Sequence, residues 1–302
     1  MKEITILSGK GGTGKTTVTA ALASLAGNAV LCDNDVDAAD LHLILDPKIQ
    51  EEHVYEGAWQ ASIHQDECEQ CQLCMEKCRF DAIHLNKEGY PEVNPFQCEG
   101  CRLCERICPA QAITSVQSKN NHWFVSSTRF GSMVHAKMGP GEENSGKLVS
   151  VVRKKAKEIA TENTADFIIN DGPPGIGCSA ISALSGTDLV VLVTEPSKSG
   201  LYDAKRLVEL AQSFDIPIGG VINKEDINTE MSDEIVAFFA SKHIPLLAKI
   251  PFNKEVVKAM VKGETITEFN DHSVMAQCIH HIWNAVKQDD FWLKPSEIES
   301  GK

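Results

Sequence analysis

The sequence predicts an α/β protein built on a doubly wound, mostly parallel sheet, with a small α+β domain inserted into it. Short apolar runs typical of buried strands alternate with helical patterns over most of the 302 residues. This alternation favours a parallel sheet with helices on both faces. Between residues 62 and 117 it gives way to two cysteine-rich repeats, which indicate a separate module that holds metal.

Composition and charge argue against several classes of function. The chain carries 29 basic and 42 acidic residues, and this net charge of −13 argues against a nucleic-acid or anionic-membrane surface. Met1 leads directly into a strand pattern and no apolar run reaches the ~18 residues of a membrane span, so we expect no signal peptide or membrane anchor. Eleven cysteines without a secretory signal indicate metal ligation in a reducing cytoplasm rather than disulfides.

The first expected strand, at 4–8, runs into the glycine-rich loop GKGGTGKTT and then into a helical pattern. This is the context that a phosphate-binding loop needs, because backbone N–H groups and the helix N-terminus then surround phosphate oxygens. Lys15 is expected to reach the β- and γ-phosphates and Thr16 to ligate Mg²⁺. The alternative, a flexible glycine turn, does not account for the intact GKT ending. The loop residues expected to bind nucleotide are Gly9, Lys10, Gly11, Gly12, Thr13, Gly14, Lys15, Thr16 and Thr17.

Lys10, near the start of this loop, makes it the KGGxGKT variant. The variant resembles the loop of the MinD/ParA/Mrp class of P-loop ATPases, which includes the nitrogenase iron protein. The resemblance implies an enzyme that hydrolyses ATP with Mg²⁺ and works as an ATP-dependent homodimer. It also implies that Lys10 crosses the dimer interface to touch the nucleotide of the other subunit.

Carboxylates after two strands match the switches of this class. A strand expected at 29–33 ends in an acidic loop, where Asp35 matches the aspartate that orients the attacking water. A merely solvated acidic turn is the alternative for this loop. The strand DFIIND ends at Asp171, which looks like the Mg²⁺-side carboxylate, usually acting through a water, and the residues from Gly172 to Gly177 look like the second switch. The residues expected to act in catalysis are Lys10, Lys15, Asp35 and Asp171.

Three more strands are expected in TDLVVLVT, IPIGGVIN and IPLLAKI. In a doubly wound sheet the nucleotide binds at the carboxyl ends of the strands. The resemblance alone assigns adenine contacts to Asn223 and to the backbone near Pro251 and Phe252.

The two cysteine runs share the spacing C-x₂-C-x₂-C-x₃-C, which is the bacterial ferredoxin pattern for two [4Fe–4S] clusters. In that pattern the fourth cysteine of each run binds the other cluster. Zinc is the alternative, but it usually takes paired C-x₂-C units rather than tandem quartets. Arg79 stands where the pattern usually has the proline that the second run keeps as Pro109. We expect one cluster on Cys68, Cys71, Cys74 and Cys108, and the second on Cys78, Cys98, Cys101 and Cys104.

Together the two resemblances match a group of MinD-superfamily ATPases that carry an inserted ferredoxin domain. We expect the ATPase domain at 1–61 and 118–290, the ferredoxin domain at 62–117 and a polar tail at 291–302. The flanks of the insert, GAWQASI and HWFVSST, alternate like strands and are expected to pair as a hairpin that carries it.

Three cysteines lie outside the quartets. Cys32 lies in an apolar strand pattern and Cys278 on the apolar face of a helical pattern, so both are expected to pack in the core. Cys178 matches a cysteine that ligates a cluster shared across the dimer in the nitrogenase iron protein and its relatives. The second cysteine that those relatives use has no counterpart between Cys108 and Cys178. A labile metal or cluster at a dimer interface and a small packing residue therefore both remain open for Cys178.

Three functions fit these features, and all three use ATP hydrolysis. The first is ATP-gated electron transfer from the ferredoxin module to an unidentified redox partner protein. The second is a carrier or assembly factor for iron–sulfur or other metal cofactors, as in the Mrp branch, acting on a client protein. The third is spatial positioning as in MinD, against which the polar C-terminus argues.

Overall fold

The computed structural model describes residues 1–139, 142 and 145–293, and the chain forms two compact units. The sheet unit comprises Met1–Glu52, Trp123–Lys137 and Ser145–Lys302, and the cysteine unit comprises His53–His122 and Met138–Asn144. From residue 294 onward, the polar tail expected at 291–302 lies outside the described residues. The described part of the chain has no helix long and apolar enough to cross a membrane.

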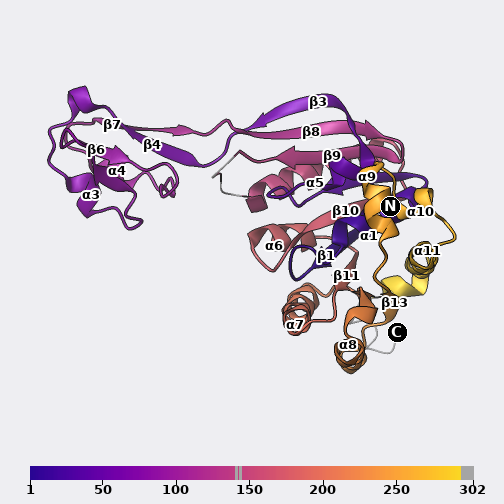
Figure 1. Cartoon of the computed structure of the whole chain (residues 1–302). Coiled ribbons are helices and arrows are strands. Elements are labelled where there is room, and N and C mark those ends of the chain that lie inside the picture. Colours follow the sequence, from indigo (N-terminus) through magenta and orange to yellow (C-terminus); the bar gives the residue numbers. More distant parts are fainter. Residues whose placement is uncertain (140–141, 143–144, 294–302) are drawn as a thin grey trace. The chain divides into compact units, whose positions relative to one another are not determined.

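The sheet unit contains one nine-stranded sheet in the order β13-β12-β11-β1-β10-β2-β9-β8-β3 (Figure 1). Neighbouring strands are parallel from β13 through to β9. The predicted α/β class with a mostly parallel sheet is therefore confirmed. The strands are β1 (Lys2–Ser8), β2 (Ala29–Asp33), β3 (Lys48–Tyr55), β8 (Asn121–Thr128), β9 (Gly131–Lys137), β10 (Phe167–Pro174), β11 (Leu189–Thr194), β12 (Ile218–Asn223) and β13 (Leu246–Ile250).

The central strands are apolar on both faces because helices cover both sides of the sheet. Ile4 of β1 lies between Ile169 of β10 and Leu189 of β11, and all three side chains are buried. Since these strands are parallel, their carboxyl ends meet at one edge of the sheet. That edge is where a doubly wound fold binds its ligand.

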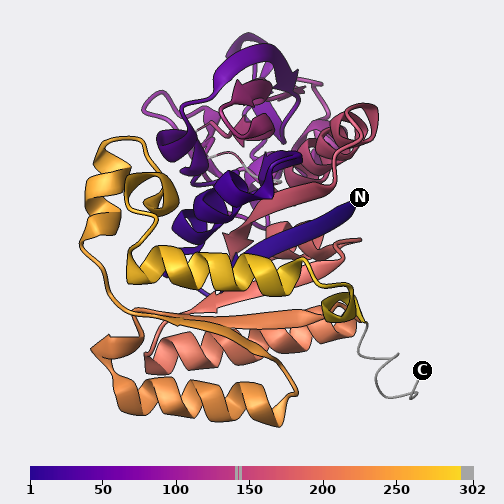
Figure 2. The same cartoon turned by 90° about the vertical axis from the view of Figure 1, so that its right-hand side faces the viewer.

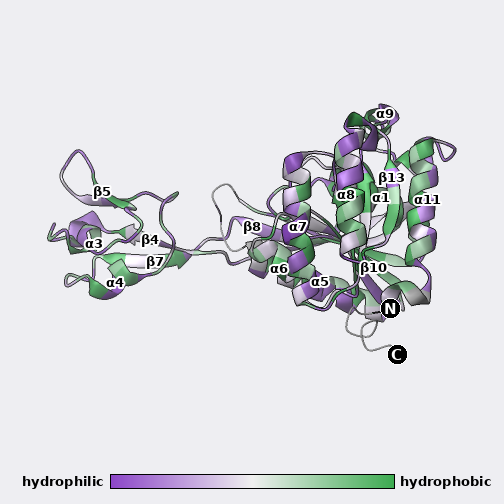
Figure 3. Ribbon diagram, turned by 90° about the horizontal axis from the view of Figure 1, so that it is seen from below, coloured by the Kyte–Doolittle hydropathy of each residue, from purple (hydrophilic) through white to green (hydrophobic). Residues whose placement is uncertain are grey.

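Two apolar cores flank the sheet (Figures 2 and 3). One joins it to α1 (Lys15–Ala26), α2 (Leu41–Leu45), α10 (Ile266–Phe269) and α11 (Val274–Val286), and α9 (Glu255–Val261) packs beside α10. The other joins it to α6 (Cys178–Leu184), α7 (Lys198–Ser213) and α8 (Thr229–Ser241), and α5 (Ser145–Glu162) packs beside α6. Helices on both faces make the sheet doubly wound, as predicted. Short 3₁₀ turns occur at η1 (Gln65–Glu67), η2 (Glu225–Ile227) and η3 (Asp289–Trp292).

The cysteine unit is built as two similar halves. Its sequence repeat has a backbone counterpart, because the positions before α3 and α4, Gln72 and Arg102, both adopt a left-handed φ of 59°. The first half contributes α3 (Leu73–Glu76) and β5 (Ile83–Leu85), and the second contributes α4 (Leu103–Ile107) and β7 (Ile113–Gln117). The pairs are β4 (Trp59–Ile63) with β7, and β5 with β6 (Pro91–Val93), both antiparallel.

The expected hairpin between GAWQASI and HWFVSST is wrong. Strand β4 pairs with β7 inside the cysteine unit and places Ile63 opposite Ile113, where both cover the small core of that unit. The residues of HWFVSST belong to β8, which joins the large sheet and buries Val125 there. Both segments alternate like strands, but β4 pairs with β7, the strand that follows the second cysteine run, and not with β8.

Candidate functional site

The phosphate-binding loop connects the end of β1 to the start of α1. Gly14 precedes Lys15, the first residue of the helix, and has a φ of 93° that favours glycine. A Cβ atom at Gly14 would also collide with the side-chain amide of Asn223. The sequence folds this way because glycine lets the loop turn tightly and lie against the end of β12.

Asp171, near the end of β10, is the centre of the polar contacts at this edge. Its carboxylate accepts hydrogen bonds from Lys15 Nζ at 2.9 Å, from Thr16 Oγ1 at 2.7 Å and from Thr19 Oγ1 at 2.8 Å. Lys15 Nζ also lies 3.4 Å from Asp35 Oδ2. The structure therefore brings together Lys15, Thr16, Asp35 and Asp171. Thr19 was not predicted as a site residue, because it lies two residues beyond the glycine-loop motif, one helical turn after Lys15.

Several carboxylates share one buried ammonium group here. Burial raises the pKa of Asp33 and Asp35, and the charge of Asp171 adds to that effect while Lys15 opposes it. Burial alone would lower the pKa of Lys15, but the surrounding carboxylates raise it overall. A site with this excess of oxygen ligands suits Mg²⁺, which prefers carboxylate and hydroxyl oxygens. Asp33 itself caps the acidic loop, because it accepts from the backbone N–H groups of Asp35 and Leu41.

Lys10 lies in an ion pair within its own subunit. Its Nζ is 2.6 Å from Glu195 Oε1 and donates to Ser199 Oγ at 3.1 Å. The other carboxylate oxygen of Glu195 lies 3.2 Å from Lys224 Nζ, which also donates to the carbonyl of Gly12 at 2.9 Å. Glu195, which follows β11, thus pairs with Lys10 of the phosphate-binding loop and with Lys224, which follows β12. Glu195 and Lys224 were not predicted as site residues, although each directly follows a predicted strand.

The three residues assigned to adenine lie at the same edge of the sheet. Asn223 ends β12 and donates from Nδ2 to the carbonyl of Thr13 at 2.7 Å. Pro251 and Phe252 follow β13, whose Ile250 pairs with Asn223. The Phe252 ring is 48% exposed at this position.

Each predicted cysteine quartet of the cysteine unit lines its own cavity. The first cavity is lined by Cys68, Cys71, Cys74 and Cys108, and the second by Cys78, Cys98, Cys101 and Cys104, with Cys74 reaching both. The second cavity encloses about 250 Å³. The first encloses about 20 Å³, roughly the space of one water molecule.

The donor set of these cavities fits iron–sulfur clusters better than single ions. No group of three or more His, Cys, Asp or Glu side chains in the described part of the chain is placed to hold one metal ion. A [4Fe–4S] cluster makes a different demand, because its four cysteines bind four separate irons and their sulfurs stand apart. Burial raises the pKa of Cys104 to about 11 and also raises that of Cys74, so these thiols lose their protons on binding iron.

The profile of the CobQ/CobB/MinD/ParA nucleotide binding domain matches residues 4–266. The chain belongs to this family. MinD from Pyrococcus horikoshii, solved with Mg-ADP, superposes with a TM-score of 0.55 at 20% identity and covers 95% of this chain and 96% of that one. That likeness shows the fold, and membership of the MinD/ParA family makes the protein a P-loop ATPase.

The sequence relatives include an uncharacterized protein that matches nearly the whole chain and iron–sulfur proteins that match part of it. The uncharacterized protein MJ0578 of Methanocaldococcus jannaschii is 31% identical over 95% of this chain and 96% of its own length. An iron-sulfur cluster carrier protein of Rickettsia typhi is 34% identical over 35% of this chain and 33% of its own length. The cytosolic Fe-S cluster assembly factor Nubp1 homolog of Drosophila melanogaster is 27% identical over 47% and 50%. The chain thus spans at most half the length of these two iron–sulfur relatives.

The remaining cysteines of this MinD/ParA-family protein differ in exposure. Cys32 is fully buried in β2, and its thiol donates to Asn34 Oδ1 at 3.0 Å. Cys278 belongs to α11 and packs half-buried against the core. Cys178 is exposed and is the first residue of α6. It lies against α5, because a Cβ atom at Gly146 would come within 3.1 Å of its own Cβ.

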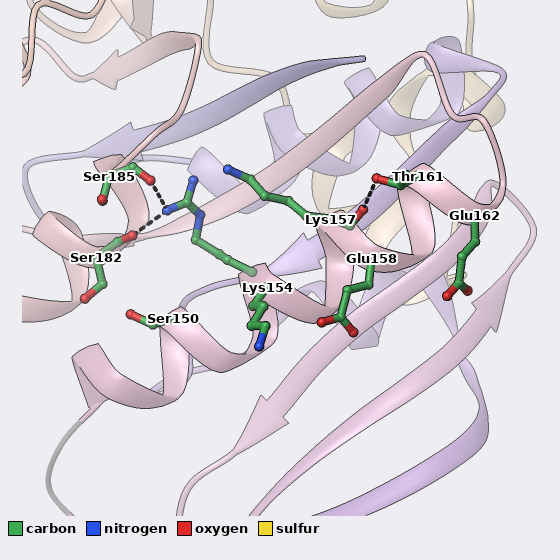
Figure 4. Close-up of a pocket in the computed structure, with 9 residues that line it drawn as sticks. Ser150, Lys154, Lys157, Glu158, Thr161, Glu162, Ser182 and Ser185 are labelled. Atoms are coloured by element: carbon green, nitrogen blue, oxygen red, sulfur yellow. Dashed lines mark hydrogen bonds between the residues drawn. The ribbon is translucent and has the colours of Figure 1, made fainter.

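A cavity of about 630 Å³ in the sheet unit is lined by residues of α5 and of the α6 region (Figure 4). It runs along α5, with Ser182 and Ser185 of the α6 region facing Lys157. The buried guanidinium of Arg153 donates to the carbonyls of Ser182 and Ser185 at 2.6 Å and to Glu3. Arg153 of this cavity thus joins α5 and the α6 region to β1, and we assign it a structural role.

Proposed function

We propose that the chain is a dimeric ATPase whose nucleotide state gates electron delivery from two [4Fe–4S] clusters to a partner protein. The observation that carries this proposal is the coincidence of each predicted cysteine quartet with one cavity. The same chain holds the buried Lys15–Asp171 pair of a MinD/ParA-family ATPase. Two low-potential redox centres and a conformational switch on one polypeptide suggest that the switch controls the redox centres.

In the sheet unit, catalysis of phosphoryl transfer depends mainly on positioning the reactants and on stabilising the negative charge of the transferring group. Lys15 would neutralise the β- and γ-phosphates. Thr16 and Asp171 would hold Mg²⁺, which would supply positive charge to the transferring phosphoryl group. Asp35 orients the attacking water, while Asn223 and the backbone at Pro251 and Phe252 hold the adenine. The loop residues Gly9, Gly11, Gly12, Thr13, Gly14 and Thr17 surround the phosphates. In the ATP-bound dimer Lys10 leaves Glu195 and reaches the nucleotide of the other subunit.

In the redox half, the cysteine quartets hold the clusters through four thiolates each. Cys68, Cys71, Cys74 and Cys108 hold one cluster, and Cys78, Cys98, Cys101 and Cys104 hold the other. A bound cluster of this kind carries single electrons at low potential. The polypeptide supplies the thiolates, the apolar shell and the charges around each cluster.

Anaerobic electron transfer tests this proposal. The protein is reduced with dithionite, freed of excess reductant and mixed with a one-electron acceptor in a stopped-flow instrument. We expect the rate of acceptor reduction with ATP to differ from the rate with ADP or without nucleotide. A Lys15→Ala variant, which keeps the cysteine unit, is the matched control and should show no ATP effect. Identical rates in every nucleotide state would rule out gating.

A second function is supported by the names of two relatives. The iron-sulfur cluster carrier and cluster assembly proteins cited above match part of this chain, and Cys178 is exposed at the start of α6. On this account a Cys178 pair in the dimer holds a labile cluster or metal for transfer to a client protein. Iron content and visible spectra of wild type and Cys178→Ala, each with ATP and with ADP, decide it. Unchanged metal content in every state argues against the carrier function.

Spatial positioning, the third function, needs ATP-dependent attachment to a surface. Pelleting with anionic vesicles in the presence of ATP tests it directly. Recovery of the protein in the supernatant with both ATP and ADP would exclude it.

A further inference from the structure

The two cysteine cavities differ in the charges around them, although they are built from one repeated pattern. Lys77, Arg79 and Arg102 line the second cavity together with one carboxylate, Glu99. The charged lining of the first cavity consists of Glu69 alone. The difference arises at matched repeat positions, since Gln72 of the first repeat corresponds to Arg102 of the second and both adopt a φ of 59°.

Exposure separates the two quartets much less than charge does. Cys74 of the first quartet is buried, and the other seven cysteines of the two quartets are half-buried or exposed. Reduction adds a negative charge to a cluster, and both nearby cations and water stabilise that charge. One contact opposes this trend, because the backbone N–H of Gln70 donates to Cys68 Sγ of the first quartet at 3.4 Å.

Arg79 is the cation whose charge is least shared. Lys77 pairs with Glu76 at 2.6 Å, and Arg102 pairs with Glu105 at 2.8 Å. Among the described residues Arg79 has no carboxylate partner. It occupies the position where the second repeat has Pro109, so the first repeat contributes this cation to the cavity of the second quartet.

We infer that Lys77, Arg79 and Arg102 make the cluster on Cys78, Cys98, Cys101 and Cys104 the first of the two to accept an electron. The inference rests on the proposed function, since it requires both quartets to hold [4Fe–4S] clusters. The step is a one-electron reduction by an external low-potential donor, and no atom or proton is transferred. The cluster on Cys68, Cys71, Cys74 and Cys108 then has the lower potential and is reduced second.

A redox titration with dithionite, followed by electron paramagnetic resonance, tests the inference on the full chain. Iron and sulfide are measured first, and about eight iron atoms per chain show that both clusters are present. We expect two separate one-electron steps whose equilibrium constants differ at least tenfold, which is 59 mV for a one-electron couple. A single unresolved step in a protein with full iron content would overturn the inference and leave the proposed function standing.

Three variants identify the step that belongs to each quartet. Arg79→Gln should lower the equilibrium constant of the first, higher-potential reduction about threefold or more. The equilibrium constant of the second reduction should not change. Gln72→Arg, which copies Arg102 into the first repeat, should raise the potential of the second reduction. The difference between the two potentials should then become smaller. Lys87→Gln removes an exposed cation of the same unit that lines neither cavity, and should change neither step by as much. A change in the lower of the two potentials caused by Arg79→Gln would contradict the assignment.

A chain that binds no clusters would overturn both the proposed function and the inference.

Discussion

In the sheet unit the groups of the nucleotide site contact one another directly, whereas in the cysteine unit the ligand side chains surround cavities. Lys15, Thr16 and Thr19 all bond to Asp171, so the site holds its shape through its own hydrogen bonds. The cysteine quartets have no comparable mutual support in this structure, and their cavities differ from about 250 to about 20 Å³. The nucleotide site is therefore held by its own hydrogen bonds, whereas the cysteine quartets surround open space.

The cores of the two units show the same contrast. Two extensive apolar clusters flank the sheet. The buried cluster of the cysteine unit consists of Ala61, Cys74, Ile83 and Ile113, and other cysteines form part of its surroundings. Small domains with little core generally need metal or disulfides to stay folded. The comparison therefore predicts that iron stabilises the cysteine unit far more than nucleotide stabilises the sheet unit.

Iron removal should produce the largest difference in stability between the two units. After anaerobic chelation we expect amide hydrogens of β4 and β7 to exchange at least about 10²-fold faster, because cluster binding and folding of the unit are coupled. Amides of β1, β10 and β11 should keep their protection. Hydrogen exchange by mass spectrometry measures both in one sample, with a mock-treated protein as control. Equal loss in the two units would show that their stabilities are not separate.

Lys15→Ala is the reciprocal change. Removing the buried ammonium should lower ATP hydrolysis by about 10² to 10³-fold, because its charge stabilises the transferring phosphoryl group. Iron content should stay at the wild-type value. Steady-state ATPase assays and metal analysis check the two expectations. Hydrolysis within a few-fold of wild type would remove Lys15 from the catalytic site.

Acidification should weaken the sheet unit through His135 of β9. Burial lowers the pKa of His135 from 6.5 to about 4, with a further contribution from His42, and its ring bonds to Ser126 and stacks on Phe124. The unfolded chain binds this proton below about pH 6.5 and the folded chain does not until about pH 4. Stability should therefore fall between these pH values, by up to about 1.4 kcal/mol per pH unit.

A His135→Gln variant should lose this part of the pH dependence. Hydrogen exchange of sheet-unit amides at pH 7, 6 and 5 is the suitable measurement, because acid also releases iron from the cysteine unit. A wild-type slope that persists in the variant would assign the effect to other groups.

Glu195→Gln should have the smallest effect. The substitution weakens the hold on Lys10 and Lys224, and partly exposed ion pairs of this kind contribute about 0.2 to 1 kcal/mol. We expect the fraction of ATP-dependent dimer at limiting ATP to rise about two- to fivefold, since Lys10 is freed to cross the interface. Analytical ultracentrifugation measures it, with Glu209→Gln on α7 as the matched control. A lower dimer fraction would give Glu195 a supporting role instead.

Local patterns in the sequence predicted the parts of the molecule that local chemistry determines. The phosphate loop lies between β1 and α1, because glycine and apolar periodicity act over a few residues. The repeat in the cysteine unit was likewise visible, since equal spacing produces equal backbone turns at Gln72 and Arg102.

Contacts between distant segments were not predictable in this way. Glu195 meets Lys10 across 185 positions, and no period or motif in the sequence joins the two. The pairing of β4 was predicted wrongly because β7 and β8 both alternate, and only the three-dimensional core shows which one faces Ile63. The volumes of the two cavities also depend on side-chain packing rather than on cysteine spacing.

Metal analysis of the anaerobically purified chain decides whether the cysteine quartets bind iron–sulfur clusters. We expect about eight iron and about eight sulfide per chain, with almost no zinc, if each quartet binds one [4Fe–4S] cluster as proposed. A Cys78→Ser, Cys98→Ser double variant should retain about half of the iron and its ATPase activity. One or two zinc ions per chain without sulfide would contradict the account and make the cysteine unit a structural zinc module.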